Sequence, residues 1–205
     1  MEIFIHILGN KKMNYYISDT HFGSEKHAQE RNFENADNMN KTFVNNINER
    51  VTSRDTLYFL GDVAQMNYNA IPLLKKINCK NIILIRGNHD AGALVKNKSH
   101  IFKSVNMIIR IYDDTIKNKI ILCHYPFSEW DGYYKGVLHF HGHTHGRNSS
   151  GTFVESLLPT SFPVSVDELG FYPRTAKEII SMKKTFEFEN IEDLTLKVSP
   201  FKNKK

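Results

Sequence analysis

The sequence predicts an α/β protein with one domain and a mainly parallel sheet. Short apolar runs rich in β-branched and aromatic residues recur along the chain, and amphipathic helical stretches separate the first three runs. The early runs are apolar throughout, as expected for strands that are buried on both faces of a sheet. At 205 residues, the chain is long enough to bury one substantial core.

Six short apolar runs are predicted to be strands, because each one ends in polar residues or glycine. Their ranges are 15–18, 57–60, 82–85, 107–111, 120–123 and 137–140. The fourth and fifth runs flank the polar segment from Asp113 to Lys119, and this arrangement predicts a hairpin.

Two helices are predicted between the first three strands, an order that is typical of a parallel sheet. The first begins near Asp37, a favourable N-cap residue, and places Phe43 and Ile47 on one apolar face. The second has Asn69 as its N-cap and Pro72 in its first turn.

The predicted domain covers 13–200, and its last predicted helix covers 175–183. The two ends of the chain lie outside this domain. Residues 1–12 have two interpretations. They form an upstream extension, because Met13 is a second plausible start, or they supply an extra strand that pairs with the first predicted strand. Residues 201–205 form a basic tail.

The composition is that of an ordinary globular protein with a modest preference for anionic partners. The net charge of +5 and the pI of about 9.1 favour phosphate esters or nucleic acid. The lysines are scattered, however, so a solvated basic surface is the simpler explanation. The two cysteines do not form a disulfide framework, and the apolar run at 3–8 is too short for a membrane helix. We therefore expect a cytoplasmic protein without a membrane partner.

Polar side chains that can bind metals or move protons follow five of the six predicted strands. They are Asp19 and His21, then Asp62, then Asn88, His89 and Asp90, then His124, and finally His143 and His145. Ligands of open α/β sheets collect beyond the carboxyl ends of strands, so we expect these side chains to lie at one edge. Oxygen and nitrogen donors without a thiolate suit Mn²⁺, Fe, Co²⁺ or Zn²⁺.

These residues form the ordered pattern D-x-H, G-D, G-N-H-D, H and G-H-x-H. In this pattern the chain resembles the calcineurin-like metallophosphoesterases, above all their small bacterial and phage-type members. The likeness extends over about 13–180. It implies a four-layer α-β-β-α sandwich of two mixed sheets, with a dinuclear metal site at the strand carboxyl ends. It also implies two divalent ions, with Mn²⁺ preferred and Fe, Zn²⁺, Co²⁺ or Ni²⁺ as alternatives.

The resemblance further implies a role for each residue of the pattern. One metal would take Asp19, His21 and His145, the other would take Asn88, His124 and His143, and Asp62 would bridge them. His89 would be the catalytic acid that assists the leaving group while a metal-bridging hydroxide attacks. The implied activity is hydrolysis of phosphoric esters, with phosphodiesters of nucleotide type preferred. The alternatives are a nuclease acting on single strands and a non-catalytic scaffold with the same fold.

The pattern departs from that of the protein Ser/Thr phosphatases, because Gly61-Asp62 is not followed by their second aspartate and arginine. We therefore expect an enzyme that is not a protein phosphatase. Arg31 is a candidate phosphate clamp, and a plain solvated arginine is the alternative. Tyr125 and Trp130 are candidates for stacking a nucleobase, and the alternative is that they pack a lid or the core.

Four further residues near the pattern carry expectations of lesser weight. His139 and His141 are expected to be core residues or neighbours of the ligands rather than ligands. Gly87 is expected to let the backbone turn sharply off its strand. Asp90 has no role that the sequence defines.

Overall fold

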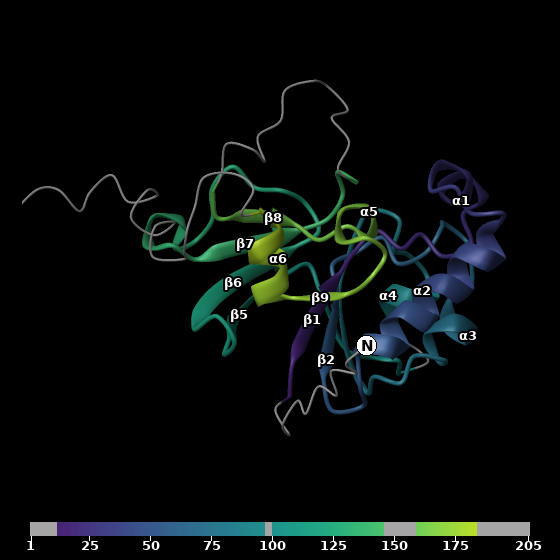
Figure 1. The fold of residues 1–205 in the computed structure, drawn as a ribbon, viewed down its shortest axis with the longest axis horizontal. Coiled ribbons are helices and arrows are strands. Elements are labelled where there is room, and N and C mark those ends of the chain that lie inside the picture. Colours follow the sequence, from purple (N-terminus) through teal and green to yellow (C-terminus); the bar gives the residue numbers. More distant parts are fainter. Residues whose placement is uncertain (1–11, 97–99, 146–158, 184–205) are drawn as a thin grey trace, which may run out of the picture.

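The computed structural model describes residues 12–96, 100–145 and 159–183 (Figure 1). The basic tail and nearly all of the predicted N-terminal segment lie outside these ranges. Within the ranges, the strands form two mixed sheets, as the resemblance implied, rather than one mainly parallel sheet. No helix among the described residues is both long and apolar enough to cross a membrane.

The first sheet has five strands in the order β4-β3-β2-β1-β9. Their bounds are β1 Asn14–Ile17, β2 Thr56–Phe59, β3 Asn81–Ile85, β4 Phe102–Asn106 and β9 Arg174–Thr175. Strands β1 to β4 are parallel, and β9 pairs with β1 in the antiparallel sense. The carboxyl ends of β1, β2 and β3 therefore meet at one edge of this sheet.

The second sheet has four strands in the order β5-β6-β7-β8. Their bounds are β5 Ile108–Asp113, β6 Asn118–Cys123, β7 Leu138–His141 and β8 Ser161–Pro163. Strands β5 and β6 form the predicted antiparallel hairpin, whereas β6, β7 and β8 are parallel. The carboxyl ends of β6 and β7 consequently lie at one edge as well.

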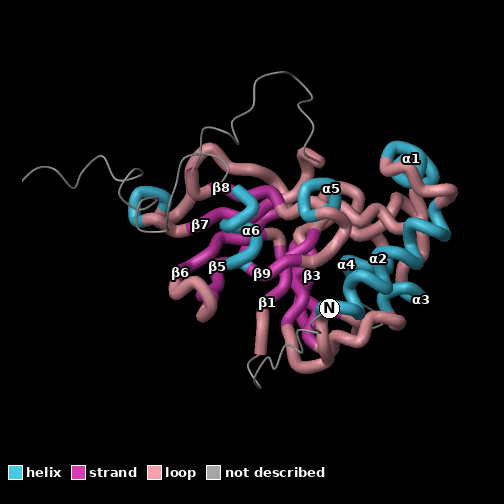
Figure 2. Tube along the Cα trace, viewed as in Figure 1, coloured by secondary structure: helices cyan, strands magenta, loops and turns pink. Residues whose placement is uncertain are grey.

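Short helices flank the sheets (Figure 2). They are α1 Glu25–Glu30, α2 Ala36–Arg50, α3 Ile71–Leu74, α4 Ala93–Lys96, α5 Val166–Leu169, α6 Ala176–Lys183 and a 3₁₀ turn at Tyr133–Lys135. Helix α2 is capped by Asn35, whose Oδ1 accepts from the backbone N–H of Asn38 at 2.8 Å. The predicted cap, Asp37, instead lies in the first turn, where its charge suits the positive end of the helix dipole.

Two large apolar clusters fill the interior, one on each face of the first sheet. Tyr15 and Ile17 of β1 belong to the cluster that contains Phe43 of α2, whereas Tyr16 belongs to the cluster that contains Phe140 of β7. This alternation is the period of two of a β-strand. The first sheet is therefore covered by helices on one face and by the second sheet on the other.

The outer face of the second sheet is covered differently. Trp130 and Val137 pack there against Ile121 of β6, next to the 3₁₀ turn. Among the described residues, an aromatic loop thus occupies the place that the resemblance assigns to a fourth, helical layer. The four-layer sandwich stays a prediction.

Candidate metal centre

The candidate site lies where the two sheets join. Backbone hydrogen bonds connect them at this point: Ser18 N–H donates to the carbonyl of Val164 (2.8 Å), and Val166 N–H donates to the carbonyl of Ser18 (3.1 Å). The loops after β1, β2 and β3 therefore face the loops after β6 and β7 across a short distance.

One group of donors gathers around the loop after β1. The ligand atoms of Asp19, His21 and Asp62 all lie within 4.8 Å of one another. Nε2 of His145, from the second sheet, is 3.1 Å from Nε2 of His21 and 3.6 Å from Oδ1 of Asp19. These four side chains can surround one cation.

A second group gathers around Asn88. Its Oδ1 lies 3.0 Å from Nε2 of His124 and 3.1 Å from Nδ1 of His143. The carboxylate of Asp62 lies between the two groups, with Oδ2 at 3.6 Å from Nε2 of His124 and 3.7 Å from Nε2 of His21. The structure thus brings all seven predicted metal ligands together, four around one centre and three around the other, with Asp62 shared.

The orientation of the imidazoles fits a cation at each centre. Nδ1 of His124 lies 2.8 Å from the carbonyl oxygen of Leu60, and Nδ1 of His145 lies 2.9 Å from Oδ2 of Asp167. Because both partners accept hydrogen bonds, the neutral form of each ring would carry its hydrogen on Nδ1 and leave Nε2 free to bind a cation. Lone pairs and carboxylate oxygens that converge in this way are the donor set of a metal site.

Burial favours the neutral, metal-binding form of His21 and His143, whereas at His145 burial is outweighed by the hydrogen bond to Asp167 and by nearby carboxylates, which raise the pKa. Burial, followed by the nearby positive groups, lowers the pKa of His21 well below its usual range, and burial and His124 lower the pKa of His143. Burial would raise the pKa of Asp167, but hydrogen bonds from Arg31 and His145 outweigh it and hold the carboxyl ionised. Asp167 can therefore orient His145 as a charged acceptor.

The backbone of the predicted ligands is strained. A positive φ is uncommon for residues other than glycine and costs of order 1–3 kcal/mol. Among the ten described residues of this kind, five are predicted ligands: Asp19 (58°), His21 (45°), Asp62 (51°), His143 (75°) and His145 (54°). Such strain collects at functional sites, where the surrounding structure holds it in place.

The glycines of the pattern allow the strand ends to approach one another. A β-carbon on Gly87 would lie 2.2 Å from Oδ1 of Asp62, and one on Gly142 would lie 2.6 Å from Oδ2 of Asp19. Gly87 was expected to be glycine because the backbone turns sharply there, and this reason is not the one that the structure gives. Its φ lies outside the left-handed region, and what requires glycine there is the contact with Asp62 rather than a sharp turn.

Asp90 ties two of the loops together. This buried carboxylate accepts backbone N–H groups from Asp62 (2.9 Å), Val63 (2.9 Å) and Gly87 (2.8 Å). Burial raises its pKa despite these bonds. Asp90, which had no predicted role, therefore fixes the loop after β2 against the loop after β3, and with it the position of Asp62.

Comparisons with known proteins place the chain in a family. No family model matches it. It is 30% identical, over 172 residues, to the uncharacterized protein MJ1445 of Methanocaldococcus jannaschii, and the match covers 82% of this chain and 89% of the relative. The chain belongs to the MJ1445 family.

Solved structures with a related fold extend this comparison. The protein of unknown function AQ665 from Aquifex aeolicus has a TM-score of 0.66 at 23% identity, over 84% of this chain and all of that chain. It therefore shares the fold of this MJ1445-family protein. A predicted phosphoesterase from Streptococcus pneumoniae matches with a TM-score of 0.36 at 15% identity, over 65% and 63% of the chains, which is too distant to bear on function.

His89 faces the centre of the site in this member of the MJ1445 family. Its backbone N–H donates to Oδ1 of Asp62 at 2.8 Å, and its Nε2 lies 4.0 Å from Oδ2 of the same carboxylate. Its ring packs edge-on against that of His21, with 5.0 Å between the centroids. Among the described residues, none hydrogen-bonds its Nδ1. The backbone anchor and the ring contact are therefore what orient His89.

Arg31 points into the protein rather than toward a substrate. Its Nε and Nη2 donate to the two oxygens of Asp167 at 2.7 and 2.8 Å. Nη2 also donates to the carbonyl of Asp19 (2.7 Å), and Nη1 donates to that of Thr20 (3.2 Å). The prediction of a phosphate clamp is corrected accordingly, because these donors already hold Asp167 and the loop after β1.

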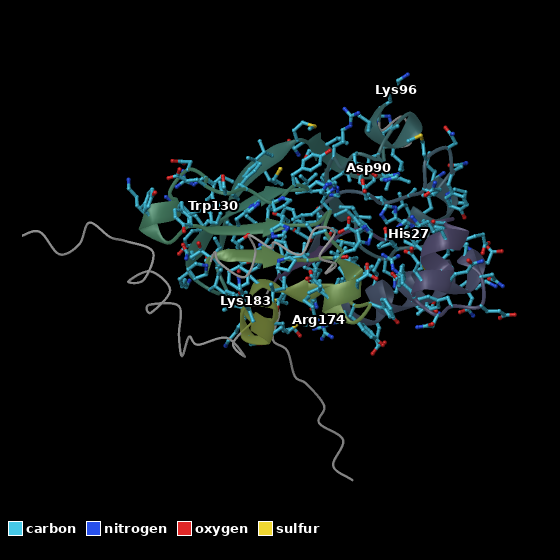
Figure 3. All side chains as sticks on the ribbon, turned by 90° about the horizontal axis from the view of Figure 1, so that it is seen from above. His27, Asp90, Lys96, Trp130, Arg174 and Lys183 are labelled. Carbon is cyan, nitrogen blue, oxygen red and sulfur yellow. The ribbon has the colours of Figure 1, made fainter. Side chains whose placement is uncertain are left out.

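Trp130 is part of a small core, and the prediction that it stacks a substrate is corrected as well. Only 8% of it is exposed, and its Nε1 donates to the carbonyl of Val137 at 2.8 Å. Figure 3 shows it far from His27. Tyr125, by contrast, packs against His143 and His124, with centroid distances of 4.8 and 5.0 Å. A substrate contact by Tyr125 remains a prediction.

The remaining histidines of β7 are strand residues. His139 and His141 are both buried, and Nδ1 of each approaches a backbone carbonyl oxygen, at 3.2 Å and 3.1 Å. Burial lowers the pKa of His139 to about 3. His139 is also stacked on Phe127. His139 and His141 therefore lie where they were expected, as core residues or neighbours of the predicted ligands.

His27 is a site residue that the sequence did not reveal. Its ring stacks on that of His21, with 3.9 Å between centroids and 4° between planes, and Nδ1 lies 2.8 Å from Oγ of Ser24. The ligand atoms of His27, His21 and His145 lie within 4.8 Å of one another. His27 is therefore a further candidate ligand beside His21 and His145. A histidine placed on the helix after the D-x-H loop was the available signal.

Proposed function

We propose that the protein is a dinuclear-metal-dependent hydrolase of phosphoric esters that acts mainly on phosphodiesters of nucleotide type. The observation that carries this proposal is the convergence of seven oxygen and nitrogen ligands from two sheets on two adjacent centres. The ordered sequence pattern supports the same reaction class. The absence of the second aspartate and the arginine after Gly61-Asp62 argues against a protein phosphatase.

In this proposal the ligands divide by their positions. Asp19, His21 and His145 would hold one ion, Asn88, His124 and His143 would hold the other, and Asp62 would contact both. Bound divalent ions would supply a water of lowered pKa and positive charge for the phosphoryl oxygens. Mn²⁺ suits this mixture of carboxylate, amide and imidazole donors.

The chain's own contribution to the reaction centres on His89. Its side chain is 32% exposed, so a substrate can reach it, and its Nε2 is directed toward the space beside Asp62. From there Nε2 would donate a proton to the oxygen of the departing alcohol. Asp62 supports this geometry, because its Oδ1 accepts the backbone N–H of His89 while Oδ2 faces the other ligands.

A nuclease that cuts single strands is the alternative within the same chemistry. The net charge of +5 favours it. Such an enzyme would degrade oligonucleotides with a steep dependence on salt, because each phosphate contact releases counterions. Turnover of small diesters together with inertness toward oligonucleotides would decide against it.

The direct test is hydrolysis of bis(p-nitrophenyl) phosphate by protein loaded with Mn²⁺, with and without a chelator. We expect turnover that the chelator abolishes and that His89→Ala reduces by about 10²–10⁴-fold, the usual contribution of a positioned acid. His100→Ala, at an exposed position in the described chain, is the matched control and should keep full activity. Absence of turnover with Mn²⁺, Co²⁺, Zn²⁺ and Fe²⁺ would favour the non-catalytic scaffold instead.

A further inference from the structure

A cavity of about 260 Å³ lies beside His89, outside the two metal centres. One wall is the segment 65–71 after β2, and the other is the segment 91–94 after β3. His89 lines the cavity and also faces Asp62. The cavity is therefore a neighbour of the position at which the departing oxygen would lie.

The lining of this pocket combines apolar surface with uncharged polar side chains, and within the described chain His89 is its one titratable imidazole. Three carboxamides, those of Gln65, Asn67 and Asn69, contribute donors and acceptors, and Ala70 and Leu94 provide an apolar, buried part. Among the described residues that line the pocket, none is a lysine, arginine, aspartate or glutamate. Away from His89, a phosphate or carboxylate group would find no opposite charge there, whereas an uncharged group with hydrogen-bonding edges would find partners.

The first wall is fixed to the loop that carries the first ligands. Ala64 bridges to Phe22, and the backbone N–H of Gln65 donates to the carbonyl of Phe22 at 2.9 Å. The ring of Tyr68 lies so close to Gly23 that a β-carbon there would be 2.1 Å from it. The hydroxyl of Tyr68 also accepts from Nδ2 of Asn40 at 3.3 Å. A wall held in this way is preformed, which reduces the entropy lost when a ligand binds.

The size of the pocket limits its occupant. Pockets that bury a whole drug-sized ligand measure about 300–1,000 Å³, and this one is slightly smaller. It suits one ring system rather than several linked nucleotides. Carboxamides read the hydrogen-bonding edges of nucleobases, and a good pair of such bonds contributes about 1–3 kcal/mol of discrimination.

We propose that this pocket binds the nucleobase on the leaving-group side of the substrate, with Gln65 as a residue that reads its edge. The inference rests on the proposed phosphodiesterase function, because it is the position of His89 that assigns the pocket to the departing alcohol. Selectivity then resides in the departing nucleoside.

The first test measures binding without added metal and without turnover. Saturation-transfer NMR with adenosine, uridine and ribose should show contact with the base protons of the nucleosides and none with free ribose. Gln65→Leu should weaken nucleoside binding about tenfold. Gln29→Leu, on the exposed face of α1, is the matched control and should bind as the unmodified protein does. Equal binding by both variants would overturn the role of Gln65.

The second test uses the metal-loaded enzyme. For a dinucleoside monophosphate, Gln65→Leu should lower kcat/KM about tenfold. For thymidine 5′-(p-nitrophenyl) phosphate it should change little, because the departing nitrophenol lacks the edge of a base. An equal change for both esters would overturn the inference. The protein could cleave neither ester while Gln65→Leu, unlike the Gln29→Leu control, loses nucleoside binding. That result would support the nucleobase pocket and refute the proposed hydrolase function.

Filling the pocket gives an independent check on its location. Ala91 is exposed at the pocket wall, so Ala91→Trp should reduce nucleoside binding without disturbing the core. Unchanged thermal unfolding with lost binding supports the assignment. Unchanged binding in a folded Ala91→Trp protein would place the nucleoside elsewhere and overturn the assignment.

Discussion

The two sheets contribute different chemistry to the same site. The first sheet supplies every predicted oxygen ligand, through Asp19, Asp62 and Asn88, together with His21. The second sheet supplies only imidazoles, from His124, His143 and His145. The difference lies also in how each set is held. The carboxylates of the first sheet accept backbone N–H groups, as Asp19 does from His143 and Asp62 from His89.

The imidazoles of the second sheet are held by acceptors on neighbouring elements. Leu60 orients His124, and Asp167 orients His145. Each acceptor fixes one ring nitrogen as a donor and leaves the other as a ligand. Backbone geometry therefore controls the first half of the site, and the orientation of side chains controls the second half.

Asp62 is the residue at which the two halves meet, so its loss should have the largest effect. In Asp62→Asn one shared oxygen becomes an amide nitrogen, which cannot bind a cation. We expect activity toward the aryl phosphodiester to fall below detection and metal binding to weaken at both centres. Asp114→Asn, at an exposed position, should change neither when both proteins are measured by steady-state kinetics and calorimetric titration.

The dependence of the first half on backbone geometry can be tested at glycine. Gly87→Ala places a β-carbon 2.2 Å from Oδ1 of Asp62, so the loop after β3 or the carboxylate must move. We expect a large loss of turnover together with lower thermal stability. Gly170→Ala is the control, because its β-carbon would meet only Nη2 of Arg174, at 3.8 Å. Its φ of 68° should cost only about 1–2 kcal/mol of stability. Similar turnover in the two variants would refute the role assigned to Gly87.

The dependence of the second half on side-chain orientation can be tested at Asp167. Asp167→Asn can present an amide N–H to His145 and release its ring, and loss of such a partner usually costs about 10–100-fold in metal affinity. Equilibrium dialysis against Mn²⁺ should show this weakening. Asp37→Asn, exposed in the first turn of α2, should leave the affinity unchanged. If Asp167→Asn bound Mn²⁺ as tightly as the unmodified protein, Asp167 would not orient a ligand.

The smallest effect on function is expected at Trp130, which lies on the outer face of the second sheet. Trp130→Phe keeps an aromatic ring but removes the hydrogen bond to Val137. We expect a loss of about 1 kcal/mol in the free energy of unfolding, measured by urea denaturation, with kcat/KM unchanged. A selective rise in KM for nucleotide substrates would restore Trp130 as a substrate contact.

Much of the fold could be predicted from the sequence, because local patterns of apolar residues mark the central strands. The fully apolar runs that became β1, β2 and β3 are recognisable without neighbours. Three strands were missed: β4, with the sequence FKSVN, β8, with three residues, and β9, with two residues. Each lies at an edge of its sheet, where a strand needs fewer apolar residues and tertiary pairing decides its structure.

The candidate metal ligands could be predicted from the sequence, because they follow strand ends in an ordered pattern. The residues that hold these ligands in place were harder to predict, because they follow no such pattern. Asp90 is close to the ligands in sequence, but its three N–H donors come from two different loops. Arg31 lies 136 residues from its partner Asp167. Which way Arg31 and Trp130 point depends on contacts that only the folded chain defines.

The central claim is that two sheets build two adjacent metal centres, and metal stoichiometry tests it most directly. The protein should be dialysed against Mn²⁺ and its bound metal counted by mass spectrometry, alongside His143→Ala and the exposed control His100→Ala. We expect two tightly bound ions per chain for the unmodified protein and the control, and one for His143→Ala, because His143 contacts only the centre at Asn88. Binding of fewer than two ions by the unmodified protein, or of two by His143→Ala, would contradict this claim.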